Sequence, residues 1–359
     1  MTQPTPQTQK INLKGLTHAK LEDLIIGWNE PKYRARQVMS WLYDKRVTQF
    51  DAMTNLSKAF RSKLAAEAYI SDANTAARTG SDDGATVKYL FELTDGNRVE
   101  SVLMHDGARV TVCVSSQVGC AMACEFCATG KMGFFRNLTA AEILDQLMAI
   151  ESDQKQTVTN IVFMGMGEPL ANYDETVDAI RVMCSPDGLG MAEKRITVSS
   201  VGLVPKIRQF TKEGLKCNLA LSLNATTDAV RTRLMPINAK YPIAETLDAA
   251  REWAITAQRK VTLEYVLIRD INDSVADANR LRRLMSSLPC KLNLIPFNEI
   301  QDSEFRRPEI ERIEQFRQTV AAGHYVAPIR FSKGREIAAA CGQLRTIYDR
   351  QGVAMPSRA

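Results

Sequence analysis

Residues 110–127 read Val-Thr-Val-Cys-Val-Ser-Ser-Gln-Val-Gly-Cys-Ala-Met-Ala-Cys-Glu-Phe-Cys. The β-branched run at 110–114 predicts a buried strand, and Cys120, Cys124 and Cys127 lie on the loop that follows it. Three thiolates within eight residues can bind one inorganic centre. Ligand-bearing loops directly after strands are typical of α/β folds whose active site forms at the carboxyl ends of parallel strands.

The alternation of strand and helix continues towards the carboxyl end. Thr139 with Glu142 three residues later is a capping-box signature for a helix that starts there. Repeated alternation predicts an α/β fold with a parallel sheet, either barrel-like or doubly wound. Further strands are predicted at 161–164, 196–199, 219–223, 261–267, 292–296 and 329–331, and further helices at 173–183, 203–213, 243–257, 275–287 and 309–321.

Before this region, two β-like runs at 86–93 and 99–104 flank the turn Asp95-Gly96-Asn97. An Asp-Gly turn between two such runs predicts a β-hairpin. We expect this hairpin to join the two parts of the chain.

The positive charge is concentrated at the amino-terminal end. Residues 1–70 hold 11 Lys/Arg and 6 Asp/Glu and therefore carry the whole net charge of +5. Such a basic module suits attraction to a phosphate backbone, and a solvated basic face explains the charge alone equally well.

Composition narrows the class of protein further. The 359 residues are 45% hydrophobic and 24% charged, which is ordinary globular usage. No apolar run has the roughly 18 residues that a membrane span needs, and the polar Met1–Lys10 segment is unlike a secretory signal. We therefore expect a cytoplasmic protein and, since no coiled coil is evident, a monomer. In a reducing compartment, the eight cysteines indicate metal binding, catalysis or core packing.

Two inorganic centres are compatible with the cysteine loop. A structural zinc site requires four ligands, and Cys113 is a possible fourth thiolate. An iron–sulfur cubane bound by three thiolates keeps one iron open for another ligand, and the three-cysteine spacing favours this centre.

The cysteine motif, with Phe126 before the last cysteine, resembles the radical S-adenosylmethionine (SAM) superfamily. Further motifs in order along the chain resemble the RlmN/Cfr family of radical SAM methyltransferases within it. They are Val114-Ser-Ser-Gln-Val-Gly-Cys120, Gly130-Lys-Met-Gly-Phe-Phe-Arg-Asn-Leu-Thr139, Phe163-Met-Gly-Met-Gly-Glu-Pro169, Leu221-Ser-Leu-Asn-Ala225, Pro296-Phe-Asn298 and Ala339-Ala-Cys341-Gly-Gln-Leu344.

The resemblance implies a partial (β/α)6-type barrel with a small helical amino-terminal domain. The expected organisation is a basic RNA-binding domain at 1–72, a β-hairpin linker at 73–105, a radical SAM core at 106–335 and a carboxyl-terminal segment at 336–359.

The activity implied by the resemblance is methylation of carbon 2 of adenosine in 23S rRNA and in tRNAs. The implied cofactors are a [4Fe-4S] cluster on Cys120, Cys124 and Cys127 and two SAM molecules per turnover, with flavodoxin or ferredoxin as electron donor. Three alternatives remain open: Cfr-type methylation of carbon 8, a radical SAM enzyme acting on a peptide or small molecule, and a non-enzymatic zinc-bearing RNA-binding protein.

By the same resemblance, a set of polar residues on the loops after successive strands binds SAM. Many relatives carry His at position 224, where this chain has Asn, which keeps a donor and an acceptor but cannot relay a proton as imidazole does. The expected SAM contacts are Gly167, Glu168, Ser199, Ser222, Leu223, Asn224 and Asn298.

Two further cysteines and one carboxylate complete the implied chemistry. Cys341 accepts a methyl group from one SAM and carries it to the adenine. Glu100 removes the proton of the adenine, and Cys113 releases the product as a transient Cys113–Cys341 disulfide forms. Cys184, Cys217 and Cys290 match no motif.

Overall fold

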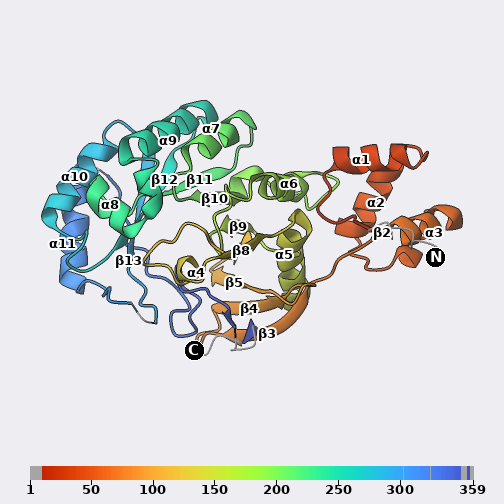
Figure 1. Ribbon diagram of the computed structural model, residues 1–359, viewed down its shortest axis with the longest axis horizontal. Coiled ribbons are helices and arrows are strands. Elements are labelled where there is room, and N and C mark those ends of the chain that lie inside the picture. Colours follow the sequence, from red (N-terminus) through yellow and green to blue (C-terminus); the bar gives the residue numbers. More distant parts are fainter. Residues whose placement is uncertain (1–9, 302, 324, 349–353, 356–359) are drawn as a thin grey trace, which may run out of the picture.

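The structure is a computed structural model that describes residues 10–301, 303–323, 325–348 and 354–355. Within these residues, nine strands form one continuous sheet in the order β13-β12-β11-β10-β9-β6-β5-β4-β3 (Figure 1). Parts of the predicted first and last segments, residues 1–9, 349–353 and 356–359, lie outside the described residues.

Six of these strands form the expected barrel. They are parallel and follow one another in chain order, so the chain winds in a single direction and its helices lie on the outside of the curved sheet (Figure 1). This excludes the doubly wound alternative and confirms the (β/α)6-type architecture. The strands are β6 (Arg109–Cys113), β9 (Asn160–Phe163), β10 (Ile196–Ser200), β11 (Asn218–Ser222), β12 (Val261–Leu267) and β13 (Cys290–Pro296).

The strand predicted at 329–331 is wrong as a full strand. Only Ile329 forms a bridge, to Leu294 of β13. Pro328 lacks an N–H with which to extend the hydrogen-bond ladder, so this segment pairs with the sheet at Ile329 alone.

The predicted helices of the barrel are present. The side-chain hydroxyl of Thr139 accepts from the backbone N–H of Glu142 at 3.2 Å, and Glu142 accepts from the N–H of Thr139 at 2.9 Å, which is the capping box expected from the sequence. The helices are α5 (Ala140–Gln154), α6 (Tyr173–Cys184), α7 (Val204–Lys212), α9 (Ile243–Ala257), α10 (Val275–Met285) and α11 (Ile310–Ala321), with the shorter α4 (Ala128–Lys131) and α8 (Asp228–Leu234).

The predicted hairpin exists but belongs to the main sheet. Strands β4 (Thr86–Glu92) and β5 (Arg98–Asp106) pair antiparallel, β3 (Asn74–Gly80) adds an outer strand, and β5 pairs with β6 of the barrel. The strand prediction was correct, whereas the expected linker is an antiparallel extension of the barrel sheet. A turn joins β5 to β6 and lets these two strands pair. Local sequence patterns do not reveal this pairing.

The amino-terminal residues form a small helical body beside α5 and α6 (Figure 1). Apolar side chains such as Leu21, Val38 and Phe60 are fully buried among its helices. The elements are β1 (Ile11–Asn12), α1 (His18–Gly27), α2 (Arg34–Tyr43), a 3-10 turn (Phe50–Ala52), α3 (Lys58–Glu67) and β2 (Ala68–Tyr69), with β1 and β2 paired in parallel.

Much of the positive charge of this body binds it to the barrel. The ammonium of Lys14 lies 2.7 Å from the Asp145 carboxylate, and both side chains are buried. Three more ion pairs cross to α5, to α6 and to the loop after α6: Arg46–Glu151, Lys20–Asp178 and Arg36–Asp187. These charges are therefore engaged in domain docking, and RNA binding by the module stays a prediction.

The remaining elements are short. Along the described chain, none of the helices has the length and apolarity that crossing a membrane requires. The short elements are β7 (Gln117–Gly119), β8 (Phe134–Asn137), two 3-10 turns (Glu193–Arg195 and Pro236–Ala239), β14 (Ile347–Tyr348) and β15 (Ala354–Met355).

Candidate active site

A two-stranded ribbon holds the base of the cysteine loop. Strand β7 precedes the loop, β8 follows it, and the two pair antiparallel. The N–H of Cys120 donates to the carbonyl of Gly133 at 2.8 Å. Gly119 has a φ of +73°, and a Cβ there would lie 2.0 Å from that carbonyl, so only glycine permits the closure.

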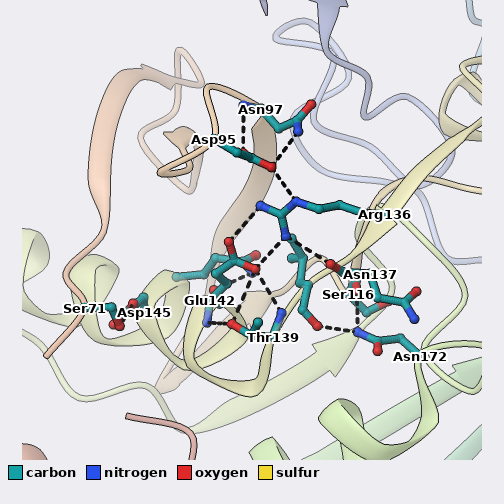
Figure 2. A network of polar contacts seen from close by, with 12 residues as sticks. Ser71, Asp95, Asn97, Ser116, Arg136, Asn137, Thr139, Glu142, Asp145 and Asn172 are labelled. Atoms are coloured by element: carbon teal, nitrogen blue, oxygen red, sulfur yellow. Dashed lines mark hydrogen bonds and ion pairs between the residues drawn. The ribbon is translucent and has the colours of Figure 1, made fainter. Parts of the chain in front are cut away.

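A polar network fixes the ribbon against the barrel (Figure 2). The guanidinium of Arg136 in β8 donates to both oxygens of Glu142 at 2.8 Å, and to Asp95 in the β4–β5 turn at 2.6 Å. The amide of Asn172 donates to the carbonyls of Ser116 and Leu138, on either side of the loop. Two segments of the sheet and the start of α5 therefore position the cysteine loop.

The three thiols of this loop face a cavity at the carboxyl ends of the barrel strands. This thiol cavity measures about 1040 Å³ with its open mouth included, a size that suits a bound small molecule. The predicted residues that line it are Cys120, Cys124, Cys127, Gly167, Glu168, Ser199, Ser222, Asn224, Asn298 and Cys341.

Of the other predicted SAM contacts, Leu223 does not line the cavity. Its side chain is fully buried and, by strand alternation, points away from the cavity that its neighbours Ser222 and Asn224 face. Any contact of Leu223 with a ligand would have to be made by its backbone.

Glu168 is a buried carboxylate on the wall of the thiol cavity. Its oxygens accept from the backbone N–H groups of Val201 at 2.9 Å and Leu170 at 3.2 Å. Burial outweighs these bonds and raises the pKa of Glu168 to about 7. Its neighbour Gly167 has a φ of +99° and lies directly against Gln117, so the backbone approaches closely there.

At this wall of the cavity, the side chains of Asn224 and Asn298 make hydrogen bonds to other parts of the protein. Asn224 adopts a φ of +56°, a region that Asn tolerates, and its side-chain oxygen accepts from the N–H of Val266 at 2.9 Å. The amide of Asn298 donates to the carbonyl of Cys341 at 3.1 Å and to the hydroxyl of Ser332 at 2.9 Å. Asn298 thus connects the last barrel strand to the segment that carries Cys341.

The segment around Cys341 lies across the cysteine loop. The N–H of Ala128 donates to the carbonyl of Gly342 at 2.7 Å, and the hydroxyl of Thr129 donates to the carbonyl of Leu344 at 2.5 Å. Gly342 has a φ of +83°. These bonds place Cys341 beside the three thiols although it is remote from them in sequence.

Cys341 and Cys113 meet at a second cavity inside the barrel. This lumen cavity is lined by both cysteines, by Thr111 and by Asn160 and Thr197 near the amino-terminal ends of their strands. Cys341 also lines the thiol cavity, so it forms part of the wall between the two. All eight cysteines are free thiols in the structure.

Burial and a nearby positive charge have opposite effects on the pKa values of the two thiols that line the lumen cavity. Burial raises the pKa of Cys113 to about 12 and also raises that of Cys341, although the side chain of Cys341 is partly accessible to solvent from the cavities that it lines. The positive charge of Arg330, which lines both cavities, favours the thiolate of each. The arrangement therefore keeps both cysteines protonated at rest, with a cation beside them.

Glu100 lies away from both cavities. It is 1% exposed, its carboxylate faces the ammonium of Lys88 at 3.1 Å, and it accepts from the N–H of Arg345 at 2.9 Å. To act as the proton acceptor that the resemblance implies, Glu100 would have to exchange a present hydrogen-bond or ion-pair partner for the substrate.

Three residues that the sequence did not single out contribute to the site. Arg231 is fully buried and donates to the carbonyls of Val201, Leu223 and Ser222, so it joins the ends of β10 and β11. Arg330 and Glu264 line the thiol cavity. A glutamate within the apolar run at 261–267 was the one signal available from the sequence.

The donor set of the cysteine loop fits an iron–sulfur cluster. Three thiols on one loop, facing a cavity with space beside them, suit a cluster that keeps one iron open for a further ligand. Among the residues that the structure describes, no group of three His, Cys, Asp or Glu side chains has the arrangement to hold a single metal ion. The fit to a cluster therefore rests on the spacing of the three thiols and on the cavity beside them.

Comparison with known proteins agrees with this site. Residues 114–281 match the model of the radical SAM superfamily, and residues 11–70 match that of the ribosomal RNA large subunit methyltransferase N-terminal domain. The crystal structure of a radical SAM methyltransferase from Sphaerobacter thermophilus superposes with a TM-score of 0.88 at 44% identity, over 93% of this chain and 99% of that one. The protein is therefore a radical SAM enzyme, a class that uses SAM and an iron–sulfur cluster.

Similarity to curated proteins identifies the family within this class. The dual-specificity RNA methyltransferase RlmN of Geobacter sulfurreducens is 49% identical over 94% of this chain and 93% of its own length. That of Pelobacter propionicus is 48% identical over 95% of this chain and 98% of its own length. The chain belongs to the RlmN family of RNA methyltransferases.

Proposed function

We propose that this enzyme methylates carbon 2 of adenosine in 23S rRNA and in tRNAs, with Cys341 as the residue that carries the methyl group. The observation that supports this most directly is the position of Cys341 on the wall shared by the two cavities. One side of that wall holds the three loop cysteines, and the other side holds Cys113.

The chemistry of adenine explains the need for Cys341. Carbon 2 has no lone pair and cannot attack the methyl group of SAM, whereas the thiolate of Cys341 is a nucleophile that can. Arg330 stabilises that thiolate against the effect of burial. When bound, the [4Fe-4S] cluster and a second SAM supply the 5′-deoxyadenosyl radical that takes a hydrogen atom from the methyl group on Cys341.

SAM binds in the thiol cavity. Cys120, Cys124 and Cys127 hold the cluster, and Gly167, Glu168, Ser199, Ser222, Asn224 and Asn298 line the space beside it. Gly167 allows the backbone to approach the ligand, and the carboxylate of Glu168 can receive the ammonium group of SAM. The expected contact of Leu223 with SAM would be made by its backbone.

Glu100 and Cys113 complete the reaction. The methylene radical left on Cys341 would add to carbon 2, so that protein and RNA become covalently linked. Glu100 takes the proton from carbon 2 once it has exchanged its bond with Arg345, which lies on the same segment as Cys341, and the unpaired electron of the adduct would return to the cluster. Cys113 then attacks the sulfur of Cys341; the bond from that sulfur to the transferred carbon breaks, the methylated base leaves, and a Cys113–Cys341 disulfide remains.

The partners follow from the same reaction. A protein of the flavodoxin or ferredoxin type supplies the electron, and the enzyme acts as a monomer in the cytoplasm. The target base must be unstacked before it can reach a cavity inside the barrel, so loops and single strands are the favoured substrates.

Nucleoside mass spectrometry tests the proposal. Reconstituted protein is incubated anaerobically with a reductant, methyl-labelled SAM and protein-free 23S rRNA or tRNA. Labelled 2-methyladenosine in both RNAs is expected, whereas 8-methyladenosine would indicate the Cfr-type reaction. If protein that holds iron and sulfide and cleaves SAM yields no methylated adenosine, the proposed substrate is wrong; stoichiometric zinc without iron would indicate the non-enzymatic alternative.

A further inference from the structure

Glu264 is a buried carboxylate on the wall of the thiol cavity to which the reaction above gives no role. It lies in the middle of β12, where it is in register with Ser222 of β11 and Asn293 of β13. Its side chain is buried and lines the cavity. Nothing in the sequence motifs assigns it a function.

The two oxygens of Glu264 have different surroundings. Oε1 accepts from the side-chain amide of Asn293 at 2.9 Å. Oε2 is buried and has no hydrogen-bond partner among the described residues. A buried carboxylate oxygen without a partner is costly, so proteins rarely keep one unless another molecule supplies the missing bond.

The surroundings of Glu264 restrict the chemical groups that such a ligand can present to it. Burial raises the pKa of Glu264, with Arg330 opposing the effect, so the carboxyl group can both donate and accept a proton in a hydrogen bond. Anionic groups such as RNA phosphates are repelled by its charged form. Apolar and aromatic side chains, including Phe297 and Val266, line the same cavity and suit a flat heterocycle.

We propose that Glu264 binds the adenosine moiety of a ligand in the thiol cavity, with Oε2 making a hydrogen bond to an N–H or O–H of the base or ribose. This rests on the proposed function, in which both SAM and the RNA target present an adenosine. The amino and carboxylate groups of SAM are expected at the cluster in radical SAM enzymes, which leaves its nucleoside for the part of the cavity where Glu264 lies.

Two substitutions at this position separate binding from folding. Glu264→Gln keeps a donor and an acceptor, whereas Glu264→Ala removes both. Glu151→Gln is the matched control, because Glu151 is also buried but has partners for both oxygens, Val158 and Arg46, and does not line the thiol cavity. In urea unfolding without ligand, we expect Glu264→Gln to be at least as stable as the wild type and Glu151→Gln to be less stable.

Binding of S-adenosylhomocysteine to the cluster-containing protein distinguishes the two sources of adenosine. If Oε2 binds the nucleoside of SAM, Glu264→Ala weakens S-adenosylhomocysteine binding at least tenfold, and Glu264→Gln recovers most of the loss. If it binds the RNA adenosine, S-adenosylhomocysteine binding is unchanged, and the yield of methylated adenosine per 5′-deoxyadenosine formed falls at least tenfold. Either result supports the proposal.

Two results would overturn it. One is unchanged S-adenosylhomocysteine binding together with an unchanged yield of product in Glu264→Ala. The other is a loss of stability in Glu264→Gln equal to that in Glu151→Gln, which would make Glu264 a structural residue. If the wild type methylates no adenosine, the proposed function fails separately, and S-adenosylhomocysteine binding alone decides the role of Glu264.

Discussion

The carboxylate of Glu100 accepts a hydrogen bond of 2.9 Å from the backbone N–H of Arg345, four residues beyond Cys341. The proposed proton acceptor and the proposed methyl carrier are therefore attached to the same segment. A movement of this segment that brings Cys341 to a substrate also releases one bond to Glu100. The hydrogen bonding of Glu100 and the position of Cys341 are therefore linked by this contact.

Glu100→Gln should impair both stability and product release. Lys88 is buried and faces Glu100 at 3.1 Å, so the amide removes the carboxylate from a buried ion pair. We expect the free energy of unfolding to fall by about 3 kcal/mol, and a covalent protein–RNA adduct to accumulate because the proton of carbon 2 stays in place. Urea unfolding and denaturing gels with labelled RNA measure the two effects.

The double variant Glu100→Gln with Lys88→Met separates these effects. Removing both charges should restore most of the stability, since a hydrophobic replacement of a buried pair is often neutral. Activity should stay lost. Recovery of methylation in the double variant would show that Glu100 contributes only its ion pair and is not the base.

Cys113→Ala should trap the protein covalently on RNA. Cys113 and Cys341 line the same lumen cavity, so a thiol is in place to attack the sulfur of Cys341, and its removal leaves that carbon–sulfur bond intact. We expect a labelled RNA adduct close to one per protein on a denaturing gel, with no released product. Cys290→Ala, at a half-buried cysteine that lines neither cavity, is the control and should turn over normally. Multiple turnovers by Cys113→Ala would exclude the resolving role.

The barrel and the loop cysteines were predictable because each depends on local pattern. The apolar run at 261–267 and the capping box at Thr139 specify strand and helix from neighbouring residues alone. The family motifs also contain most of the polar residues that line the thiol cavity.

Other features depend on contacts between distant segments. Charge counting was compatible with a phosphate-binding module and with a solvated basic face, yet Lys14 is buried against Asp145 because the helical body docks on α5. The hairpin was expected to be a linker, and only the pairing of β5 with β6 shows that it extends the sheet. The unpartnered oxygen of Glu264 is likewise a property of three neighbouring strands rather than of its own sequence.

Gly167→Ala should disrupt the wall of the thiol cavity. A Cβ there would lie 2.5 Å from Cβ of Gln117 and 2.8 Å from its backbone nitrogen, at a φ of +99°. We expect a loss of about 3 kcal/mol in the free energy of unfolding, and weaker SAM binding because Glu168 shifts with the backbone. Gly190→Ala is the control: its φ is +63° but no atom lies within 4 Å of the added Cβ, so only about 1 kcal/mol should be lost. Equal effects of the two substitutions would show that the backbone angle alone, without the close approach, explains the cost.

The buried carboxyl of Glu168 should make the SAM-free protein less stable as the pH rises. Its pKa is about 7 in the folded chain against 4.5 for an ordinary glutamate, so between these values the folded state holds a proton that the unfolded state releases. Stability therefore falls with increasing pH through this window, and the fall ends above pH 7. From pH 5.5 to 7.5 the contribution of Glu168 amounts to about 2 kcal/mol.

Urea unfolding of the wild type and of Glu168→Gln across this pH range measures that contribution. Other carboxyls with raised pKa values, such as Asp145 and Glu264, are present in both proteins and cancel in the comparison. The stability of Glu168→Gln should depend less on pH, by about 2 kcal/mol over the range, whatever the absolute cost of losing one acceptor for the N–H groups of Leu170 and Val201. Parallel curves for the two proteins would mean that Glu168 is ionised throughout the range; it would then present a permanent anion, rather than a titrating group, to the ammonium of SAM.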